Sequence, residues 1–411
     1  MRFLVFLGVA VLFTLTFAHH EEGHHDHHEK DGHHDDHHEP SPFEEIAPFN
    51  YEFTIDLYKQ IARDHPSENI VFAPISIAAS FASLSLGAKG QTHSQIIEAL
   101  EFNTSEISDK KINEGFHQLL ELWNDEHKEL QVHDGSALYV SNDHKVLPSF
   151  SDEAKRLYFA ETFSIDFKHQ EEAIHEINNY VEKHTHGKIA KIVDSVHQDA
   201  HLFLVNYMYY NGKWEHPFDK ALTHEGDFHI SETKTVKVPF MTRTGFYSVA
   251  FSDEYTQVYV PYKGNARALF LMPIEGKMEQ LEQGITKELN DKWRKKSHDE
   301  FIELSIPKFS LSDSMELKET LIKMGMVDVF SDHADLSGII GEGHIKLDQV
   351  VHEAVINVDE AGTEAGAVTG EEVAVHSVPR KVVIDRPFLF TLHDYKTRTV
   401  PFTARVVDPT K

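Results

Sequence analysis

The stretch from Val358 to Val368 decides how this chain folds: Val-Asp-Glu-Ala-Gly-Thr-Glu-Ala-Gly-Ala-Val. An acidic pair, Asp359 and Glu360, leads into a run of Gly, Ala and Thr with no large apolar side chain before Val368. Small residues let such a segment lie on a surface as an exposed loop, or fit as an extra strand inside a sheet. No proline interrupts residues 359–378, so every backbone N–H there can join a ladder. The segment is therefore predicted to fit either as an exposed loop or as a strand within a sheet.

Length and composition are enough for one large globular domain or two ordinary ones, held together by burial alone. The chain has 411 residues, of which 40% are hydrophobic, enough for a single large core. It has no cysteine, which excludes disulfides, cysteine nucleophiles and thiolate metal sites. The net charge of −28, with histidine neutral, argues against general nucleic-acid binding.

The N-terminus is typical of a secreted protein. Residues 1–18 begin with Arg2, continue with an apolar run and end with small residues at Thr16 and Ala18. This pattern predicts a secretory signal peptide over residues 1–18 and an extracellular location. An uncleaved membrane anchor is the alternative, but the apolar run is too short for one. No later stretch is long and apolar enough to span a bilayer, so no membrane contact is expected.

Residues 19–47 are expected to form a disordered tail rich in histidine and acidic residues, because their composition cannot bury a core. Ten of the twenty residues from His19 to His38 are histidine, and imidazole binds zinc, copper and nickel. The tail is either a weak, pH-sensitive binder of divalent metal or a solvated spacer. The match of residues 20–24 to H-E-x-x-H is attributed to chance, since that chemistry requires a stable helix. The candidate metal ligands are His19, His20, His24, His25, His27, His28, His33, His34, His37 and His38.

The folded domain is expected over residues 48–411. Apolar residues at helical spacing predict a helix from Phe49 to Ile61, and the run 69–86 predicts a short strand followed by a buried helix from Pro74. Two more helices are expected at 91–100 and before Gly187. Helices early and strands late indicate one α+β domain. Strand-like runs occur at 202–210, 257–260, 268–272, 302–309, 382–384, 388–392 and 402–407.

Motifs along this whole domain are similar to those of the serpin family, and specifically of its extracellular antitrypsin-like branch. The motifs are Asn69–Ile77, Leu84–Ala88, Val205–Tyr207, Gly212–Phe218, Ile306–Phe309, Ala334–Gly338 and Asp385–Phe390, together with the segment quoted first. The resemblance implies a monomer with three β-sheets, about nine α-helices and an exposed reactive loop at about 360–381.

The resemblance also implies two clusters that control opening of the large sheet. The shutter cluster, under the sheet, maps to Ser76, Asn206 and His352; ordinary core polar residues are the alternative interpretation. A serine expected in this cluster is Ala73 here, which puts one hydrogen bond in doubt. The breach cluster, where the loop would enter the sheet, maps to Trp214, Lys308 and Glu360. An exposed ion pair between Lys308 and Glu360 would contribute little by itself.

The loop segment implies a reactive bond by the family's spacing. Counting seventeen residues from Glu360 reaches His376, so His376–Ser377 is the expected bond, and Val375–His376 is the alternative. The expected hinge residues are Glu360, Gly362, Thr363, Ala365 and Ala367. The side chains expected to face inward on insertion are Thr363, Ala365, Ala367, Thr369, Glu371 and Val373. The first four are small, whereas the late carboxylate must find solvent or a partner.

The implied function is secreted serine-protease inhibition by a suicide substrate, which is not an enzyme and uses no cofactor. A chymotrypsin- or elastase-like target is expected, because histidine or valine before the bond does not suit a trypsin pocket. A hormone or small-molecule carrier on the same fold is the alternative, and metal buffering by the tail is a third function. Asn103-Thr104-Ser105 is the expected glycosylation site. The basic run Trp293–Lys296 is interpreted as a solvated helix face rather than a heparin site, because acidic residues dilute it.

Overall fold

The computed structural model describes residues 39–124, 131–361 and 378–411. Among these residues it has ten α-helices, close to the nine expected, and two short 3-10 helices, Lys220–Leu222 and Asp328–Phe330. The α-helices are α1 (Pro42–Asp64), α2 (Pro74–Ser85), α3 (Gly90–Ala99), α4 (Asp109–Trp123), α5 (Pro148–Tyr158), α6 (Gln170–His184), α7 (Met278–Gly284), α8 (Lys287–Lys296), α9 (Lys318–Lys323) and α10 (Ser337–Ile340). None of the described helices is long and apolar enough to cross a bilayer.

Fourteen strands alternate with these helices among the described residues, mostly in the second half of the chain. They are β1 (Ile70–Phe72), β2 (Gln131–Ser141), β3 (Glu161–Ile165), β4 (Leu202–Asn211), β5 (His224–Ser231), β6 (Lys234–Phe251), β7 (Tyr255–Pro261), β8 (Ala266–Pro273), β9 (His298–Pro307), β10 (Phe309–Glu316), β11 (Leu347–Val358), β12 (Arg380–Val383), β13 (Phe388–Asp394) and β14 (Thr399–Val406). The α+β class is confirmed.

The five-stranded sheet has the order β10-β11-β4-β2-β3. At its centre, β4 and β11 run parallel from the pair Leu202–Leu347 to the pair Tyr210–Ile356. On the outer sides, β10 pairs antiparallel with β11, and β2 pairs antiparallel with β4. We call the parallel boundary between β4 and β11 the seam. It is the only parallel contact between long strands in the described part of this sheet, since β2 and β3 pair over five residues.

The remaining nine strands form one hydrogen-bonded network where the family resemblance implies two further sheets. The long strand β6 explains the difference. Its first part pairs with β5, its middle with β9 and its last four residues with β7, so it passes through two sheet surfaces and joins them. At one end of the network, the short strand β12 pairs in parallel with β9.

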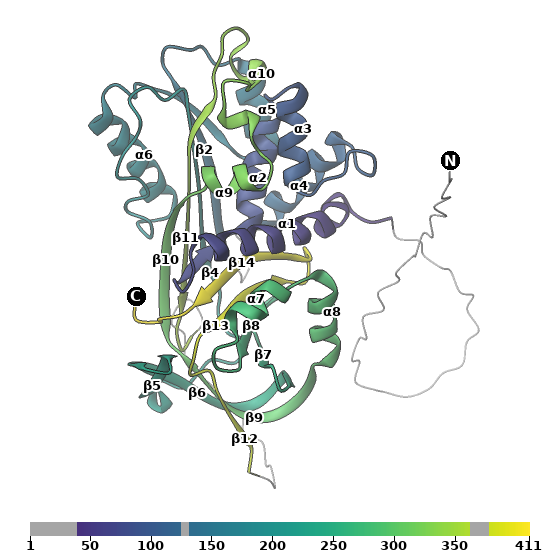
Figure 1. Cartoon of the computed structure of the whole chain (residues 1–411), viewed down its shortest axis with the longest axis vertical. Coiled ribbons are helices and arrows are strands. Elements are labelled where there is room, and N and C mark those ends of the chain that lie inside the picture. The colour runs from purple at the N-terminus through teal and green to yellow at the C-terminus, as the bar shows by residue number, and fades with distance from the viewer. Residues whose placement is uncertain (1–38, 125–130, 362–377) are drawn as a thin grey trace, which may run out of the picture. The chain divides into compact units, whose positions relative to one another are not determined.

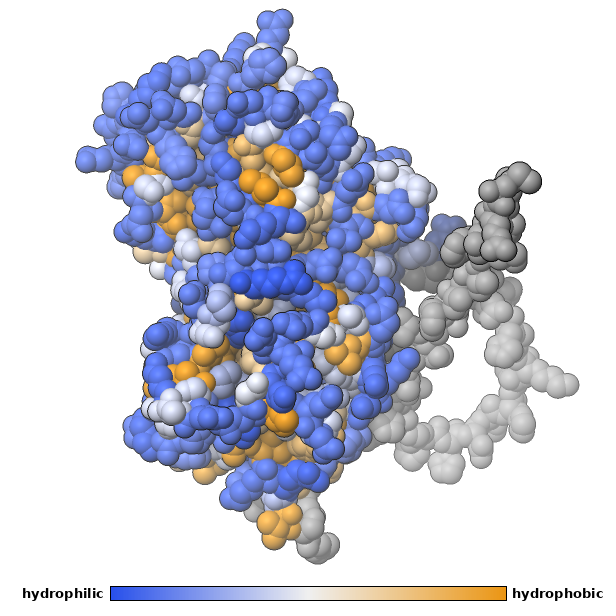
Figure 2. Space-filling view, viewed as in Figure 1, coloured by the Kyte–Doolittle hydropathy of each residue, from blue (hydrophilic) through white to orange (hydrophobic). Residues whose placement is uncertain are grey.

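Helices cover both faces of the five-stranded sheet (Figure 1). The whole of α2 is buried behind the sheet, within the main hydrophobic cluster. On the opposite face, α6 and the segment after it form a second cluster with β2, β4 and β11. In Figure 1, α2 to α5 gather on one side of β2 and α6 lies on the other. The surface in this view is mostly hydrophilic (Figure 2). The sheet therefore separates two cores.

The folded part begins earlier than the sequence suggested. Pro48 was expected to start the domain, but it lies inside α1, which begins at Pro42. The backbone N–H and hydroxyl of Ser41 donate to the Glu44 carboxylate at 2.9 and 2.8 Å, and this caps the helix. Ile46 is fully buried. The tail boundary at residue 47 is therefore wrong for residues 42–47, and Pro40–Lys411 form one compact unit.

One expected strand is two strands. The apolar run 302–309 predicted a single strand, but β9 ends at Pro307 and β10 begins at Phe309. The two strands belong to different sheets, and Lys308 lies at the crossing. The other expected helices and strands are confirmed to within a few residues.

Candidate functional site

The seam is closed at one end by the breach residues. Its ladder stops at Tyr210 and Ile356, and β11 continues to Val358 and then into the hinge. Trp214 lies across this end. Its indole N–H donates to the carbonyl of Asp359 at 2.8 Å, and its backbone N–H donates to the carbonyl of Ala361 at 3.0 Å. Trp214 thus holds the first residues of the hinge from both its side chain and its backbone.

The Trp214 ring is itself held firmly. It is completely buried and stacks on Tyr262 with ring centroids 4.1 Å apart. Phe218 packs edge-on against it at 6.1 Å, and the backbone N–H of Phe218 donates to the carbonyl of Glu360 at 2.7 Å. The segment 214–218 therefore fixes the carbonyls of three successive residues at the start of the hinge.

Glu360 is buried and carries a charge. Lys308 Nζ lies 2.9 Å from its Oε2, and the Thr223 hydroxyl donates to its Oε1 at 3.0 Å. Burial by itself would raise the pKa of Glu360. Hydrogen bonds from Lys308, from its own backbone and from Thr223 outweigh burial and hold that pKa below its usual range. The expected pair of Lys308 and Glu360 is formed, and it is more than a surface ion pair because the Glu360 side chain is only 6% exposed.

The shutter residues also come together, directly under the seam. His352 of β11 and Asn206 of β4 are partners in the parallel register, so each lies on one side of the seam. The Nδ1–H of His352 donates to Asn206 Oδ1 at 2.5 Å, and Asn206 Nδ2 donates to the Ser76 hydroxyl of α2 at 2.6 Å. All three residues are buried. The cluster ties the two strands of the seam to each other and to the helix beneath.

The doubtful hydrogen bond of this cluster is made by the backbone. Ala73, which replaces the expected serine, donates its backbone N–H to His352 Nε2 at 3.0 Å. Because Nε2 accepts, the imidazole is neutral and carries its proton on Nδ1. Burial lowers the pKa of His352 to about 3, so the ring stays neutral at physiological pH. The absence of a serine at position 73 therefore leaves no hydrogen bond of His352 unmade.

Asp134 extends the cluster, and the sequence gives no signal for it. The Ser76 hydroxyl donates to Asp134 Oδ1, which continues the hydrogen bonds from α2 to β2. Burial raises the pKa of Asp134 to about 7, and the bond from Ser76 offsets only part of that rise. An aspartate beside Gly135 in a polar strand resembles any surface residue in the sequence, and only the pairing of β2 with β4 brings it under the sheet.

The front of the seam is covered by α6 and the segment 185–200. Val351 and Val355 of β11, and Val205 and Phe203 of β4, pack in the second cluster with residues of this cover. Asn178 of α6 holds the segment. Its Oδ1 accepts from the backbone N–H groups at 192 and 193, at 2.8 and 3.0 Å. The cover therefore packs on both strands of the seam, and sequence reasoning did not identify it.

The expected reactive bond, His376–Ser377, and the hinge residues Gly362, Thr363, Ala365 and Ala367 lie outside the described residues. The ends of this segment are described. Ala361 is buried at the breach, and Val378 is 91% exposed just before β12. Among the described residues, no group of three or more His, Cys, Asp or Glu could hold a metal ion, and the ten tail histidines lie outside them. Asn103 is in the described part and is exposed directly before the turn at 104–106.

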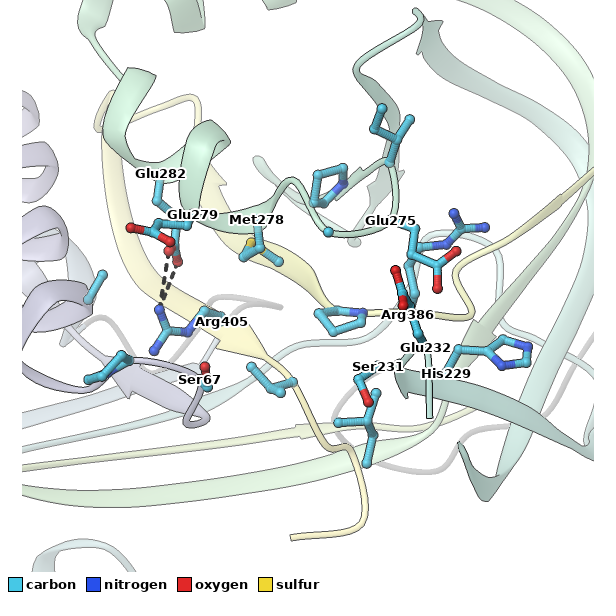
Figure 3. Close-up of a pocket in the computed structure, with 18 of the residues that line it drawn as sticks. Ser67, His229, Ser231, Glu232, Glu275, Met278, Glu279, Glu282, Arg386 and Arg405 are labelled. Atoms are coloured by element: carbon cyan, nitrogen blue, oxygen red, sulfur yellow. Dashed lines mark hydrogen bonds and ion pairs between the residues drawn. The ribbon is translucent and has the colours of Figure 1, made fainter. Parts of the chain in front are cut away.

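A groove of about 860 Å³ opens between the end of α1, β5, α7 and β14 (Figure 3). At one end, Arg405 Nη1 lies 3.0 Å from Glu282 Oε1, and the Tyr58 hydroxyl donates to the same oxygen at 2.5 Å. The other end has the charged side chains of Glu232, Glu275 and Arg386. The buried charges among the described lining residues are paired with each other, so they need no ligand to satisfy them.

Comparison with known proteins gives a consistent result. A family model described as Serpin (serine protease inhibitor) matches residues 49–409. An alpha-1-antiproteinase of Callosciurus caniceps is 42% identical over 376 residues, 91% of each chain. An alpha-1-antitrypsin of Sus scrofa is 39% identical over 419 residues, 99% of this chain and 98% of the relative. Human thyroxine-binding globulin in complex with thyroxine superposes with a TM-score of 0.86 at 34% identity, covering 90% of this chain and 100% of that one.

Proposed function

The chain belongs to the serpin family, and on that premise we propose that it is a secreted serine-protease inhibitor that works once, as a suicide substrate. The observation that carries this proposal is the parallel seam, which ends where the hinge begins. A strand that follows β11 after a reversal of direction would run antiparallel to both β11 and β4. Two antiparallel ladders would then replace one parallel ladder, and antiparallel pairing is the more stable per residue.

The first step would be chemistry at the reactive bond. The serine oxygen of the protease adds to the carbonyl carbon of His376, and its proton passes to the protease's histidine. The His376–Ser377 bond then breaks, the proton goes to the amine of Ser377, and an ester joins His376 to the protease. The inhibitor contributes only the bond that is attacked. It therefore has no catalytic residues and needs no cofactor.

The second step would be insertion of the cut loop into the seam. The freed segment 362–375 enters from the breach, with the small side chains Thr363, Ala365, Ala367 and Thr369 facing inward. Separation of β4 from β11 breaks the bond between His352 and Asn206, and new ladder bonds offset that loss. The protease is carried along with its ester bond before water can hydrolyse it. The native fold thus stores the driving force.

The target is proposed from the residues before the bond. A neutral His376 suits a chymotrypsin-like pocket, and Val375, if cleavage occurs one residue earlier, suits an elastase-like pocket. We further propose that residues 1–18 are a signal peptide, that the protein is an extracellular monomer, that Asn103 is glycosylated, and that the tail histidines bind divalent metal weakly. These proposals rest on sequence pattern and on family likeness.

A carrier function is the second candidate, because the similar human structure is a thyroxine complex. The groove beside α7 is large enough for a small molecule, but its buried charges are already paired. The small residues of the hinge favour the inhibitor. Carriers and inhibitors differ in a measurable way, because an inhibitor requires complete insertion of its loop.

The test is incubation with chymotrypsin and with pancreatic elastase. We expect a covalent complex that survives SDS, release of a C-terminal peptide beginning at Ser377 or His376, and a large rise in melting temperature after cleavage of the loop. Mass spectrometry of the released peptide identifies the bond. A cleaved chain whose melting temperature is no higher than that of the intact chain would contradict the proposal. A carrier function would then be the better-supported hypothesis.

A further inference from the structure

An aromatic pair lies on the outer face of the sheet formed by β6, β9 and β12. Phe246 of β6 is 62% exposed, which makes it the most exposed Phe, Tyr or Trp in the described part of the chain. Phe301 of β9 is its partner in the antiparallel register, and the two rings meet at an angle of 62° with centroids 5.2 Å apart. Large apolar side chains in the middle of a strand are usually covered. This pair is in contact with solvent.

The pair lies beside the point where the reactive loop rejoins the sheet. In the parallel register of β12 and β9, Arg380 lies opposite Ile302, so Pro379 is level with Phe301. Pro379, Phe301 and Phe246 therefore form a row across the outer face, from the sheet edge inward. Neighbouring strands are about 4.8 Å apart, so the row extends about 10 Å from the line of β12.

A charged pair borders this row on the same face. Lys381 lies 3.0 Å from Glu303, two positions along β12 and β9 from Pro379 and Phe301. The apolar side chain of Val383, two positions further along β12, is 39% exposed. Arg380 and Glu300 lie on the opposite face, where Arg380 stacks over the ring of Phe251. The lower end of the molecule in Figure 2 has orange side chains among blue ones. An apolar centre with a charged rim is the anatomy of a protein contact surface.

The length of chain between the reactive bond and the sheet identifies the occupant. Three residue steps separate Ser377 from Arg380, which span at most about 10 Å. A protease of about 230 residues has a radius of gyration of about 17 Å. A protease that holds His376 and Ser377 in its active site must therefore lie over the sheet edge next to Phe301.

We propose that Phe246 and Phe301 form a second contact site for the target protease, which takes an apolar side chain of the protease next to its active-site cleft. This inference rests on the proposed function. The pair adds contact area that a short peptide substrate lacks, so it selects among proteases that accept the same residues before the bond. The surface acts in the reversible encounter that precedes chemistry.

The test compares the full chain with Phe246→Ala and with the double variant Phe246→Ala/Phe301→Ala. We expect the second-order rate constant for covalent complex formation with chymotrypsin or elastase to fall about tenfold, with the melting temperature unchanged for Phe246→Ala. Phe159→Ala is the matched control, because Phe159 is 44% exposed and directly follows α5 as its C-cap residue, outside the sheet of β6, β9 and β12. Rate constants that agree within about twofold among wild type, control and Phe246→Ala would overturn the proposal.

A second measurement separates this inference from the proposed function. Chymotrypsin and elastase whose catalytic serine is replaced by alanine bind without chemistry, and their Kd for the wild type should be about tenfold lower than for Phe246→Ala. If these proteases discriminate but no covalent complex forms, the contact site stands and the inhibitor proposal fails. If neither binds the wild type, the contact site is wrong for these targets. Sedimentation that reveals a dimer lost in Phe246→Ala would assign the surface to a second copy and also overturn the proposal.

Discussion

Glu360 links the loop to the body of the protein through its side chain and one backbone contact. Its carboxylate has Lys308 and Thr223 as partners, its carbonyl accepts from Phe218, and its neighbours are held by Trp214. His352 does the equivalent work under the seam, where it is neutral and fully hydrogen-bonded. At the scale of single residues, the closed sheet is thus held at its end and beneath its centre.

The first prediction concerns the breach pair. Glu360→Gln removes a buried charge that Lys308 and Thr223 stabilise. We therefore expect the free energy of unfolding to fall by about 1 kcal/mol and the melting temperature to fall with it. The matched control is Glu303→Gln. Its partner Lys381 is 71% exposed, and exposed pairs contribute little. Thermal melts of the three proteins decide the matter, and equal shifts for the two variants would contradict the assigned role of Glu360.

The second prediction concerns pH. The pKa of His352 is about 3 in the folded protein and about 6.5 in the unfolded chain, so only the unfolded chain takes up this proton between those values. The contribution of the neutral His352 to the free energy of unfolding is fully present above pH 6.5. It is lost as pH falls, by up to about 1.4 kcal/mol per pH unit. We expect the melting temperature of His352→Gln to fall less than that of the wild type between pH 7.5 and 5.0.

Asp134 provides the control of opposite sign. Its pKa is raised to about 7 in the folded protein, so between about pH 4 and 7 the folded protein holds this proton and the unfolded chain does not. The contribution of Asp134 to the free energy of unfolding is therefore lost as pH rises through that range. In Asp134→Asn, the decline of melting temperature on acidification should therefore be steeper than in the wild type. Parallel curves for the wild type and both variants would contradict the assigned environments.

At the scale of elements, the sequence predicts those whose signal is local. Pro74 and the apolar run after it predict α2, and the residues named for the breach and the shutter are hydrogen-bonded to one another. The crossing at Lys308 was missed because an unbroken apolar run gives no sign that its two ends pair in different sheets. The start of α1 was missed because Pro48 looked like a boundary. Asp134 and the cover by α6 depend on pairing between distant segments, which one sequence does not reveal.

The third prediction concerns which hinge side chains face into the sheet after insertion. Thr363 is expected to face inward on insertion and Glu364 outward, so Thr363→Arg would place a charge under the sheet. We expect Thr363→Arg to be cleaved as a plain substrate, with a loss of covalent complex by more than about tenfold. Glu364→Arg should keep most of the inhibition. Gel analysis after incubation with protease measures both, and equal behaviour would contradict the expected register.

The fourth prediction concerns the cover of the seam. Asn178→Ala removes two acceptor contacts and one donor contact between α6 and the segment that follows, so we expect a loss of about 1–3 kcal/mol and a lower melting temperature. The adjacent Asn179 is exposed and bonds only within α6, to His175 at 2.9 Å, so Asn179→Ala is the control. A melting temperature equal to that of the control would show that the cover is held by packing alone.

At the scale of the whole molecule, the fold is one compact unit from Pro40 onward, built around a sheet with one parallel seam. The loop leaves that sheet at one strand of the seam and returns to the other network at β12. The proposed protease contact lies beside the return point, and the proposed insertion starts at the point of departure. Under these two proposals, one end of the loop serves recognition of the protease and the other serves insertion.

The fifth prediction concerns the tail. Deletion of residues 19–39 should abolish retention on a nickel resin and leave the melting temperature and inhibition unchanged, because the tail is rich in histidine and precedes the folded unit. Deletion of residues 19–41 also removes the Ser41 cap of α1 and should cost about 1 kcal/mol. Melting temperatures that are lowered equally by the two deletions would contradict the boundary at Pro40.

The two cores on opposite faces of the five-stranded sheet have a further consequence for local unfolding of the native protein. The smaller core under α6 is connected to the rest mainly through the strands it covers, so it can open as a separate cooperative unit while the main core stays intact. Amide protons of α6 should then exchange with deuterated water sooner than those of α2. At low population and without any protease, the native state would then already sample the opening of the α6 cover that insertion of the loop requires.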